Sequence, residues 1–214
     1  LDTSHTEFIA FFSHQFSDVF YVDGYTSITD NANESERQVD FGDINYVAEG
    51  DFDADKDQWG LTAGYILNIK QVSIDATLTL SQSNTTIERY EETGGTTVDN
   101  LNLIYESQRV ESQTVSLGVV SSLNISTSNG VLVPFLRVEA IKENQNDARE
   151  ITSRLVSAAS SFNLSTEAPD REFMIIGGGV KLVATKGIQC YLDTDWMVAH
   201  EYLQTWRISA GLRI

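Results

Sequence analysis

Few residues in this 214-residue chain have the spacing that catalysis or metal binding requires. Its three histidines, His5, His14 and His200, show no metal-ligand spacing, and no Gly-x-Ser-x-Gly sequence is present to position a serine nucleophile. The glycines at residues 177–179 lie within an alternating strand pattern with no helix after them, which is not the context of a phosphate-binding loop. The sequence therefore predicts neither an enzyme nor a cofactor.

An acidic segment comes closest to a metal-binding motif. Residues 51–57 carry an aspartate at every second position, as a calcium-binding loop does. Lys56 occupies the position where that loop needs glycine, and Thr62 stands where its bidentate glutamate belongs. We interpret the segment as a solvated acidic stretch, and no metal site is predicted.

Charged residues near the C terminus are the best candidates for a functional role. Asp193 and Asp195 lie on one predicted strand, and Arg207 and Arg213 lie on the next. In both strands the charges alternate with apolar residues, so that they share one face of a sheet. These four residues either contact another polypeptide segment or pair with one another, and the sequence leaves both interpretations open.

The strand that carries the two arginines ends the chain and shows the alternation most clearly. Its polar face holds Arg207, Ser209, Gly211 and Arg213. Its apolar face holds Trp206, Ile208, Ala210, Leu212 and Ile214. An amphipathic strand of this kind suits the closure of a barrel. It also resembles the C-terminal targeting strand of bacterial outer-membrane proteins.

The same alternation recurs along most of the chain, and helical periodicity is almost absent. We expect about nine antiparallel strands, joined in turn by short turns and by long polar loops at roughly residues 29–57, 82–113 and 143–170. All short turns then lie at one end of the sheet and all long loops at the other. This arrangement indicates an antiparallel up-and-down transmembrane β-barrel of the outer-membrane type.

Composition excludes several other classes. The formal net charge of -17 disfavours nucleic acid as a partner, because phosphates would be repelled. It also disfavours attachment to an anionic membrane through a basic patch. The single cysteine, Cys190, excludes an internal disulfide framework. No stretch of the sequence approaches the roughly 20 apolar residues of a membrane-spanning helix.

Three features favour a lipid-facing apolar exterior and a polar lumen over the reverse. The polar face carries charges of both signs, which can pair inside a lumen. It is also rich in glycine, which a narrow interior requires, and the apolar face has aromatic residues near strand ends, as in an interfacial belt. The belt residues are Trp59, Tyr65, Trp196 and Trp206. The predicted lumen-lining residues are Arg137, Glu139, Lys181, Tyr191, Asp193, Asp195, Arg207 and Arg213.

The number of strands raises a question about completeness. Bacterial single-chain barrels have an even number of strands, and about nine are expected here. If the short turns face the periplasm, the first strand runs inward and residue 1 lies at the extracellular end. We therefore expect residues 1–214 to form one N-terminally incomplete barrel domain, unless a strand lies hidden in a long loop.

Several stretches resemble, in order, the C-terminal translocator domain of autotransporters, the type V secretion family. They begin with Pro134, Arg137 and Glu139 in a Pro-x-x-Arg-x-Glu pattern, and they end with Tyr191 and Asp193 in a Tyr-x-Asp strand before the last strand. The complete set comprises residues 133–139, 147–149, 168–171, 177–180, 191–193 and 209–214. The match is strong over residues 115–214 and looser over residues 7–90.

The resemblance implies the C-terminal part of a twelve-stranded barrel whose lumen is threaded by a helix. It implies a location in the outer membrane of a Gram-negative bacterium, where the domain anchors a passenger segment and helps to export it. The implied partners are outer-membrane lipid, the protein's own passenger or linker segment, and the barrel-assembly machinery. Two alternatives remain: a passenger-less porin or adhesin-like barrel that uses its acidic loops outside the cell, and a soluble barrel with an apolar ligand inside.

Overall fold

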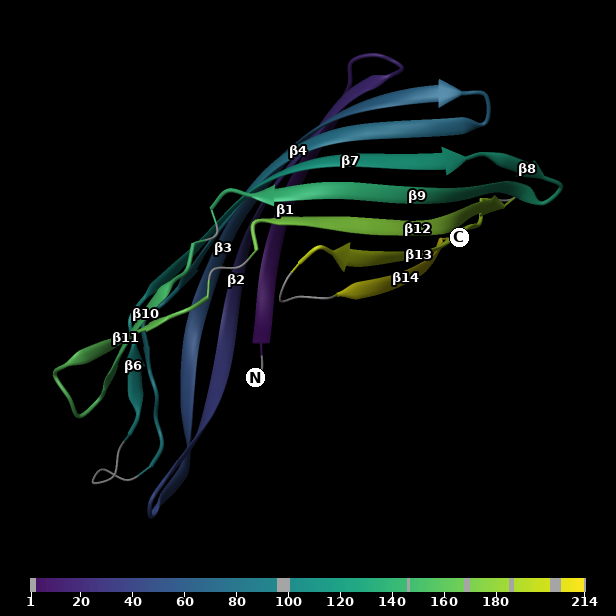
Figure 1. Ribbon diagram of the computed structural model, residues 1–214. Helices are drawn as coiled ribbons and strands as arrows, with labels where there is room; N and C mark the ends of the chain where they lie inside the picture. The colour runs from purple at the N-terminus through teal and green to yellow at the C-terminus, as the bar shows by residue number, and fades with distance from the viewer. Residues whose placement is uncertain are drawn as a thin grey trace.

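A curled antiparallel β-sheet dominates the computed structural model (Figure 1). The structure describes residues 3–95, 101–145, 147–167, 170–184, 187–200 and 205–213. Nine strands lie side by side in their sequence order, and the short strand β8 (Ile125–Thr127) also pairs with β9. The nine are β1 (Thr3–Gln15), β2 (Phe20–Phe41), β3 (Ile44–Ile69), β4 (Val72–Ile87), β7 (Gln108–Leu123), β9 (Gly130–Glu143), β12 (Glu172–Ala184), β13 (Gln189–Val198) and β14 (Trp206–Arg213).

The order of the strands confirms the predicted all-β, up-and-down fold. Short connections at residues 16–19, 70–71 and 128–129 lie at one end of the sheet, and the connections at 88–107 and 144–171 lie at the other. Among the described residues, β1 and β14 each pair along one edge. Completion of the barrel by further strands stays a prediction. The described residues contain no helix that could span a membrane.

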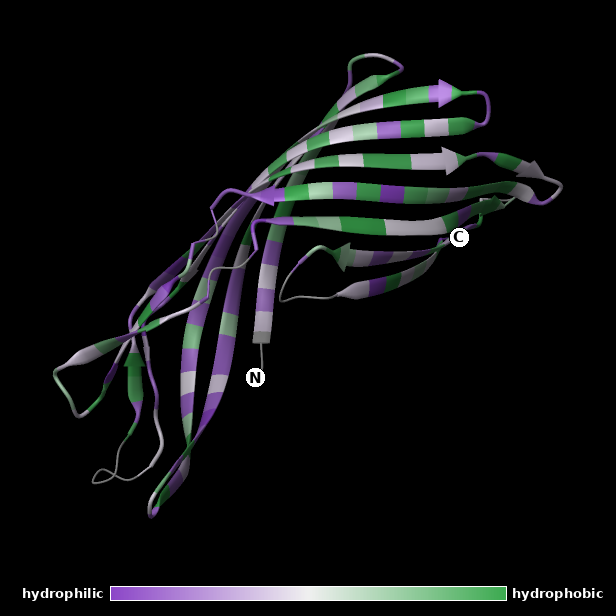
Figure 2. Cartoon of the chain, viewed as in Figure 1, coloured by the Kyte–Doolittle hydropathy of each residue, from purple (hydrophilic) through white to green (hydrophobic). Residues whose placement is uncertain are grey.

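The two faces of the curled sheet differ in composition and exposure, and Figure 2 shows the alternation along its strands. Leu78, Leu136 and Ile208, on the apolar face, are 47%, 70% and 61% exposed. Ser116 and Asp195, on the polar face, are 7% and 9% exposed. Side chains on the inside of a curl crowd together, so we assign the polar face to the concave side. A soluble barrel with an apolar interior is therefore wrong for the described residues.

Glycines on the concave face seat aromatic rings from the neighbouring strand. Tyr21 of β2 lies opposite Gly64 of β3, and Tyr191 of β13 lies opposite Gly211 of β14. A Cβ atom built on either glycine would collide with the ring of its tyrosine. A ring that covers a glycine of the next strand compensates for the missing side chain and helps to fix the register. The high glycine content of this face thus has a local packing cause.

Strands β2 and β3 continue well beyond the rest of the sheet as one long hairpin. They are paired from Phe20–Tyr65 to Phe41–Ile44, and only Gly42 and Asp43 form the turn, with Gly42 at a φ of 62°. The prediction of a long loop over residues 29–57 is therefore wrong. Side chains still alternate there, but carboxylates occupy one face where apolar residues would reveal a strand.

The register of this hairpin places like charges opposite each other. Asp30 faces Asp55, Glu34 faces Asp51, and Glu36 faces Glu49. By alternation these carboxylates lie on the face that is apolar in the part of the sheet nearer the short turns. Directly opposed like charges destabilise a strand pair, so neither hairpin packing nor local charge pairing explains this row.

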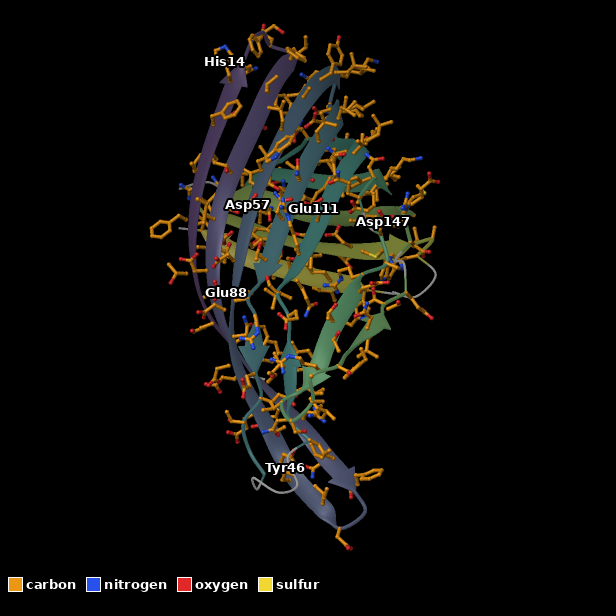
Figure 3. The ribbon with its side chains drawn as sticks, turned by 90° about the vertical axis from the view of Figure 1, so that its left-hand side faces the viewer. His14, Tyr46, Asp57, Glu88, Glu111 and Asp147 are labelled. Atoms are coloured by element: carbon orange, nitrogen blue, oxygen red, sulfur yellow. The ribbon has the colours of Figure 1, made fainter. Side chains whose placement is uncertain are left out.

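A second, four-stranded sheet packs on the other face of the hairpin. It has the order β11 (Ser161–Ser165), β10 (Glu150–Leu155), β6 (Leu103–Tyr105) and β5 (Tyr90–Glu91). The two loops predicted at 82–113 and 143–170 therefore contain short strands. We call this sheet together with residues 30–55 the extension. Figure 3 shows Tyr46 near its tip, with His14 at the opposite end of the molecule.

Candidate functional site

Three charged side chains meet on the concave face of β9, β13 and β14. The register aligns Arg137, Gly177, Asp195 and Arg207 in one row across β9, β12, β13 and β14. Gly177 has no side chain, so Arg137 reaches across β12 to form an ion pair with Asp195 Oδ1. Arg207 Nη2 donates to Asp195 Oδ2 at 2.5 Å. We call Arg137, Asp195 and Arg207 the concave ion cluster.

The other predicted lumen-lining residues share this face but stand apart from the cluster. Lys181 Nζ lies 5.2 Å from the centroid of the Phe135 ring, in a cation–π arrangement. Tyr191 covers Gly211. Among the described residues, Glu139, Asp193 and Arg213 form no ion pair within 4.0 Å. The structure thus brings together three of the eight residues.

The predicted membrane-targeting residues lie on the convex face. Trp206, Ile208 and Leu212 are 67%, 61% and 67% exposed, as a lipid-facing strand requires. Ala210 shares their side of β14 by alternation. Ile214 lies outside the described residues.

The concave face of β2 and β4 holds polar groups that the sequence does not single out. The Tyr21 hydroxyl passes over Gly64 and donates to Asp75 Oδ2 at 2.9 Å. Asp23 Oδ1 is buried and has no hydrogen-bond partner among the described residues. No described arginine or lysine lies within 4.0 Å of the Asp23 or Asp75 carboxylate. In the sequence, these polar groups could be recognised from Tyr21 and Asp23, which alternate along one strand, and from the glycine-rich strand that follows.

A second, separate ion pair holds the extension together. Arg37 of β2 donates from Nε to Glu92 Oε1 at 2.8 Å and from Nη2 to Glu92 Oε2 at 2.5 Å. Glu92 is 4% exposed and also accepts the backbone N–H of Leu103 at 2.8 Å. The hydrogen bond to Glu92 raises the pKa of Arg37, so this guanidinium stays protonated. This arrangement fixes the second sheet to the hairpin.

An aromatic stack adjoins this ion pair. The rings of Phe52, Tyr90 and Tyr105 are stacked in sequence, with 4.7 Å between successive centroids. Burial raises the pKa of Tyr90, and burial together with the charge of Glu92 raises the pKa of Tyr105. The stack and the ion pair are structural contacts, with no nucleophile activated by a neighbouring base.

The remaining polar clefts lie at the long-loop end of the sheet. One of them has a volume of about 650 Å³, and its lining includes Lys142, Glu143, Arg171 and His200. His200 Nδ1 lies 3.4 Å from Asp170 Oδ2. Among the described residues, no group of three or more His, Cys, Asp or Glu side chains is arranged to hold a metal ion.

Comparison with known proteins assigns the chain to a family. The family model described as Autotransporter beta-domain matches residues 1–195, so the chain belongs to the autotransporter β-domain family. The match includes the N-terminal strands, where the motif resemblance is looser. Members of this family are translocator barrels of the bacterial outer membrane that take part in passenger export, and the family is not catalytic.

Among solved structures, the chain is similar to the beta domain of the Bordetella autotransporter BrkA. The two are 11% identical, and the match covers 97% of this chain and 81% of that chain, with a TM-score of 0.41. A search of curated proteins found no match.

Proposed function

We propose that this domain resides in the outer membrane of the bacterium that produces it, and anchors a passenger segment at the cell surface. Its convex face contacts lipid, and its concave face lies against the segment that passes through the barrel. The observation that carries this proposal is the opposite character of the two faces. Leu136 is 70% exposed on the convex side, whereas the ion-paired Asp195 is 9% exposed on the concave side.

The concave residues have two kinds of role in this proposal. The concave ion cluster pairs one carboxylate with two guanidinium groups and links β9, β13 and β14, because Asp195 contacts arginines on both sides. Glu139, Asp193 and Arg213 instead present charges to a passing segment. In this proposal the two interpretations left open by the sequence apply to different residues. Some charged side chains pair with one another, and others contact the passing segment.

The proposal is tested in cells that produce the full-length protein. We expect the domain to remain in the detergent-resistant outer-membrane fraction, and we expect protease added to intact cells to remove the passenger. Leu136→Arg should reduce recovery of the membrane-inserted form, because a charge on the lipid-facing side is costly. Lys142→Met is the matched control, since Lys142 is an exposed residue of the same strand near the long-loop end. A domain that stays monodisperse in buffer without detergent would contradict the proposal.

A further inference from the structure

Strand β1 departs from the residue pattern of the concave face. Ile9 and Phe11 point to that face, because they pair with Ser27 and Tyr25 of β2, which lie on it. Their side chains are 60% and 84% exposed. The other face of β1 is also apolar, with Phe8, Ala10 and Phe12. Strands that are apolar on both faces are typically buried on both faces. The convex side has lipid, so the concave side of β1 requires a cover.

A side chain of a neighbouring strand can cover part of such a residue, as Lys181 of β12 covers Phe135 of β9. The backbone of a strand paired along the free edge of β1 would lie in the plane of the sheet, about 5 Å to the side, whereas the Phe11 side chain stands out of that plane. Phe11 therefore faces the bore, where it is 84% exposed.

The groups beside Phe11 define the charge of that cover. A cleft of about 360 Å³ is lined by residues that include Phe11, Asp23, Tyr25 and Thr62. Asp23 contributes a buried carboxylate oxygen without a hydrogen-bond partner among the described residues, and Asp75 on β4 accepts from the Tyr21 hydroxyl. A carboxylate removed from water needs a donor or a cation. The lining of this cleft includes the hydroxyls of Ser13 and Thr62 but no lysine or arginine.

We propose that Ile9, Phe11 and Tyr25 form a seat for an apolar stripe of the passenger segment that occupies the bore, and that a lysine or arginine next to this stripe pairs with Asp23. The inference rests on the proposed function, because it takes the occupant to be a segment of the exported polypeptide. It adds the chemistry and the orientation of that segment. Its apolar and basic side faces β1 and β2, and its remaining polar side faces the wall formed by β9, β13 and β14.

A photo-crosslinking experiment on the full-length protein in intact cells tests the seat. Benzoylphenylalanine replaces Phe11 in one variant and Phe8 in another, since both are exposed phenylalanines of β1 and the alternation places them on opposite faces. We expect the probe at residue 11 to give a cross-link to the passenger segment, mapped by mass spectrometry to an apolar stretch with an adjacent lysine or arginine. We expect the probe at residue 8 to give no such cross-link.

Asp23→Lys tests the charge in the same assay. This substitution should abolish the cross-link from residue 11, and reversal of the mapped basic residue to glutamate should restore it. Asp43→Lys is the control, since Asp43 lies in the exposed turn of the β2–β3 hairpin, outside the bore, and should leave the cross-link unchanged. Heat-dependent migration in SDS gels shows that each variant barrel is folded.

The outcomes separate this inference from the proposed function. Passenger that reaches the cell surface without a cross-link from residue 11 would overturn the seat and leave the export function standing. Equal cross-linking from residues 11 and 8, or a cross-link only to another protein, would also overturn it. Failure of the unmodified protein to expose any passenger would instead contradict the proposed function.

Discussion

The curled sheet and the extension place their apolar residues in opposite ways. In the curled sheet most of the large apolar side chains point outward, as Leu117 and Leu192 do at 62% and 52% exposure. In the extension the pattern reverses: the buried apolar residues of the described chain are Val39, Ala48, Ala54 and Ile104, and all four lie there. One polypeptide thus places its apolar residues mainly outside in the first region and inside in the second.

This difference shows where the stability of each region originates. The curled sheet has no packed apolar core among its described residues, so its strands depend on ladder hydrogen bonds and, in the proposed outer-membrane location, on the surrounding lipid. The extension follows the rule for water-soluble sheets, with a small apolar centre, a buried ion pair and an aromatic stack. Substitutions that introduce or remove charge should therefore affect the two regions differently.

The largest effect is expected from a charge placed at the middle of the lipid-facing side. Leu78→Arg should destabilise the membrane-inserted sheet by about 2–4 kcal/mol, because the guanidinium enters the hydrocarbon region. Thr79→Lys changes the next residue, which points to the concave face, and should cost much less. Urea unfolding in lipid vesicles, followed by heat-dependent gel migration, measures both. Equal costs for the two substitutions would remove the distinction between the faces.

A smaller and local effect is expected in the extension. Arg37→Met leaves the buried Glu92 carboxylate without its bidentate partner, which should destabilise the extension by about 1–3 kcal/mol. Arg109→Met breaks the exposed pair with Glu111 and should cost about 0–1 kcal/mol. Amide hydrogen exchange should show faster exchange over residues 90–105 in the first variant alone. Faster exchange throughout the curled sheet would show that the regions are not separate units.

The contact between a glycine of the curled sheet and the tyrosine ring that covers it should be measurable as a coupling energy. Gly64→Ala forces the Tyr21 ring from its position and disturbs its hydrogen bond to Asp75, at a cost of about 1 kcal/mol. The same substitution in a Tyr21→Ala background should cost less, because no ring then covers residue 64. A double-mutant cycle on urea unfolding measures the difference. A coupling energy of zero would show that the ring and the glycine are independent.

The smallest effect is a loss of stability of the extension at alkaline pH. The pKa values of Tyr90 and Tyr105 are raised in the folded state, so this state holds the phenol protons more tightly than the unfolded state does. Their contribution is complete below the ordinary tyrosine pKa of about 10 and declines as pH rises through the folded-state values. Limited proteolysis between about pH 8 and about pH 11 should show increasing cleavage near these residues. Tyr90→Phe keeps the stack and should weaken this pH dependence, and an unchanged dependence would contradict the assignment.

Sequence patterning predicts the curled sheet because two different environments act on alternate residues. In β4 the apolar Ile74, Leu78 and Leu80 alternate with polar residues, so the strand is evident without coordinates. In the hairpin one face is aqueous and the other packs on the second sheet through only a few apolar residues, such as Val39, Ala48 and Ala54. The alternation of Asp51, Asp53 and Asp55 with other residues therefore carries no clear apolar signal. The strands of the extension are consequently hidden from any hydropathy pattern.

The contacts within each site depend on pairings that sequence does not reveal. Asp195 and Arg207 are recognisable as neighbours on adjacent strands, but the contact with Arg137 requires the glycine at position 177 between them. Arg37 and Glu92 are 55 positions apart, on elements that the sequence presents as two unrelated loops. Their pairing follows from the fold of the extension, which sequence alone does not supply.

The opposed carboxylates along the long hairpin influence how the hairpin is oriented relative to a membrane surface. Asp30, Glu34 and Asp51 would be repelled by anionic groups on a membrane surface beneath them, and salt only partly screens this repulsion. In the proposed placement, with the long-loop end outside the cell, this repulsion disfavours contact between the hairpin and the membrane surface. Phe41 beside its turn, 72% exposed, then lies at the extracellular tip.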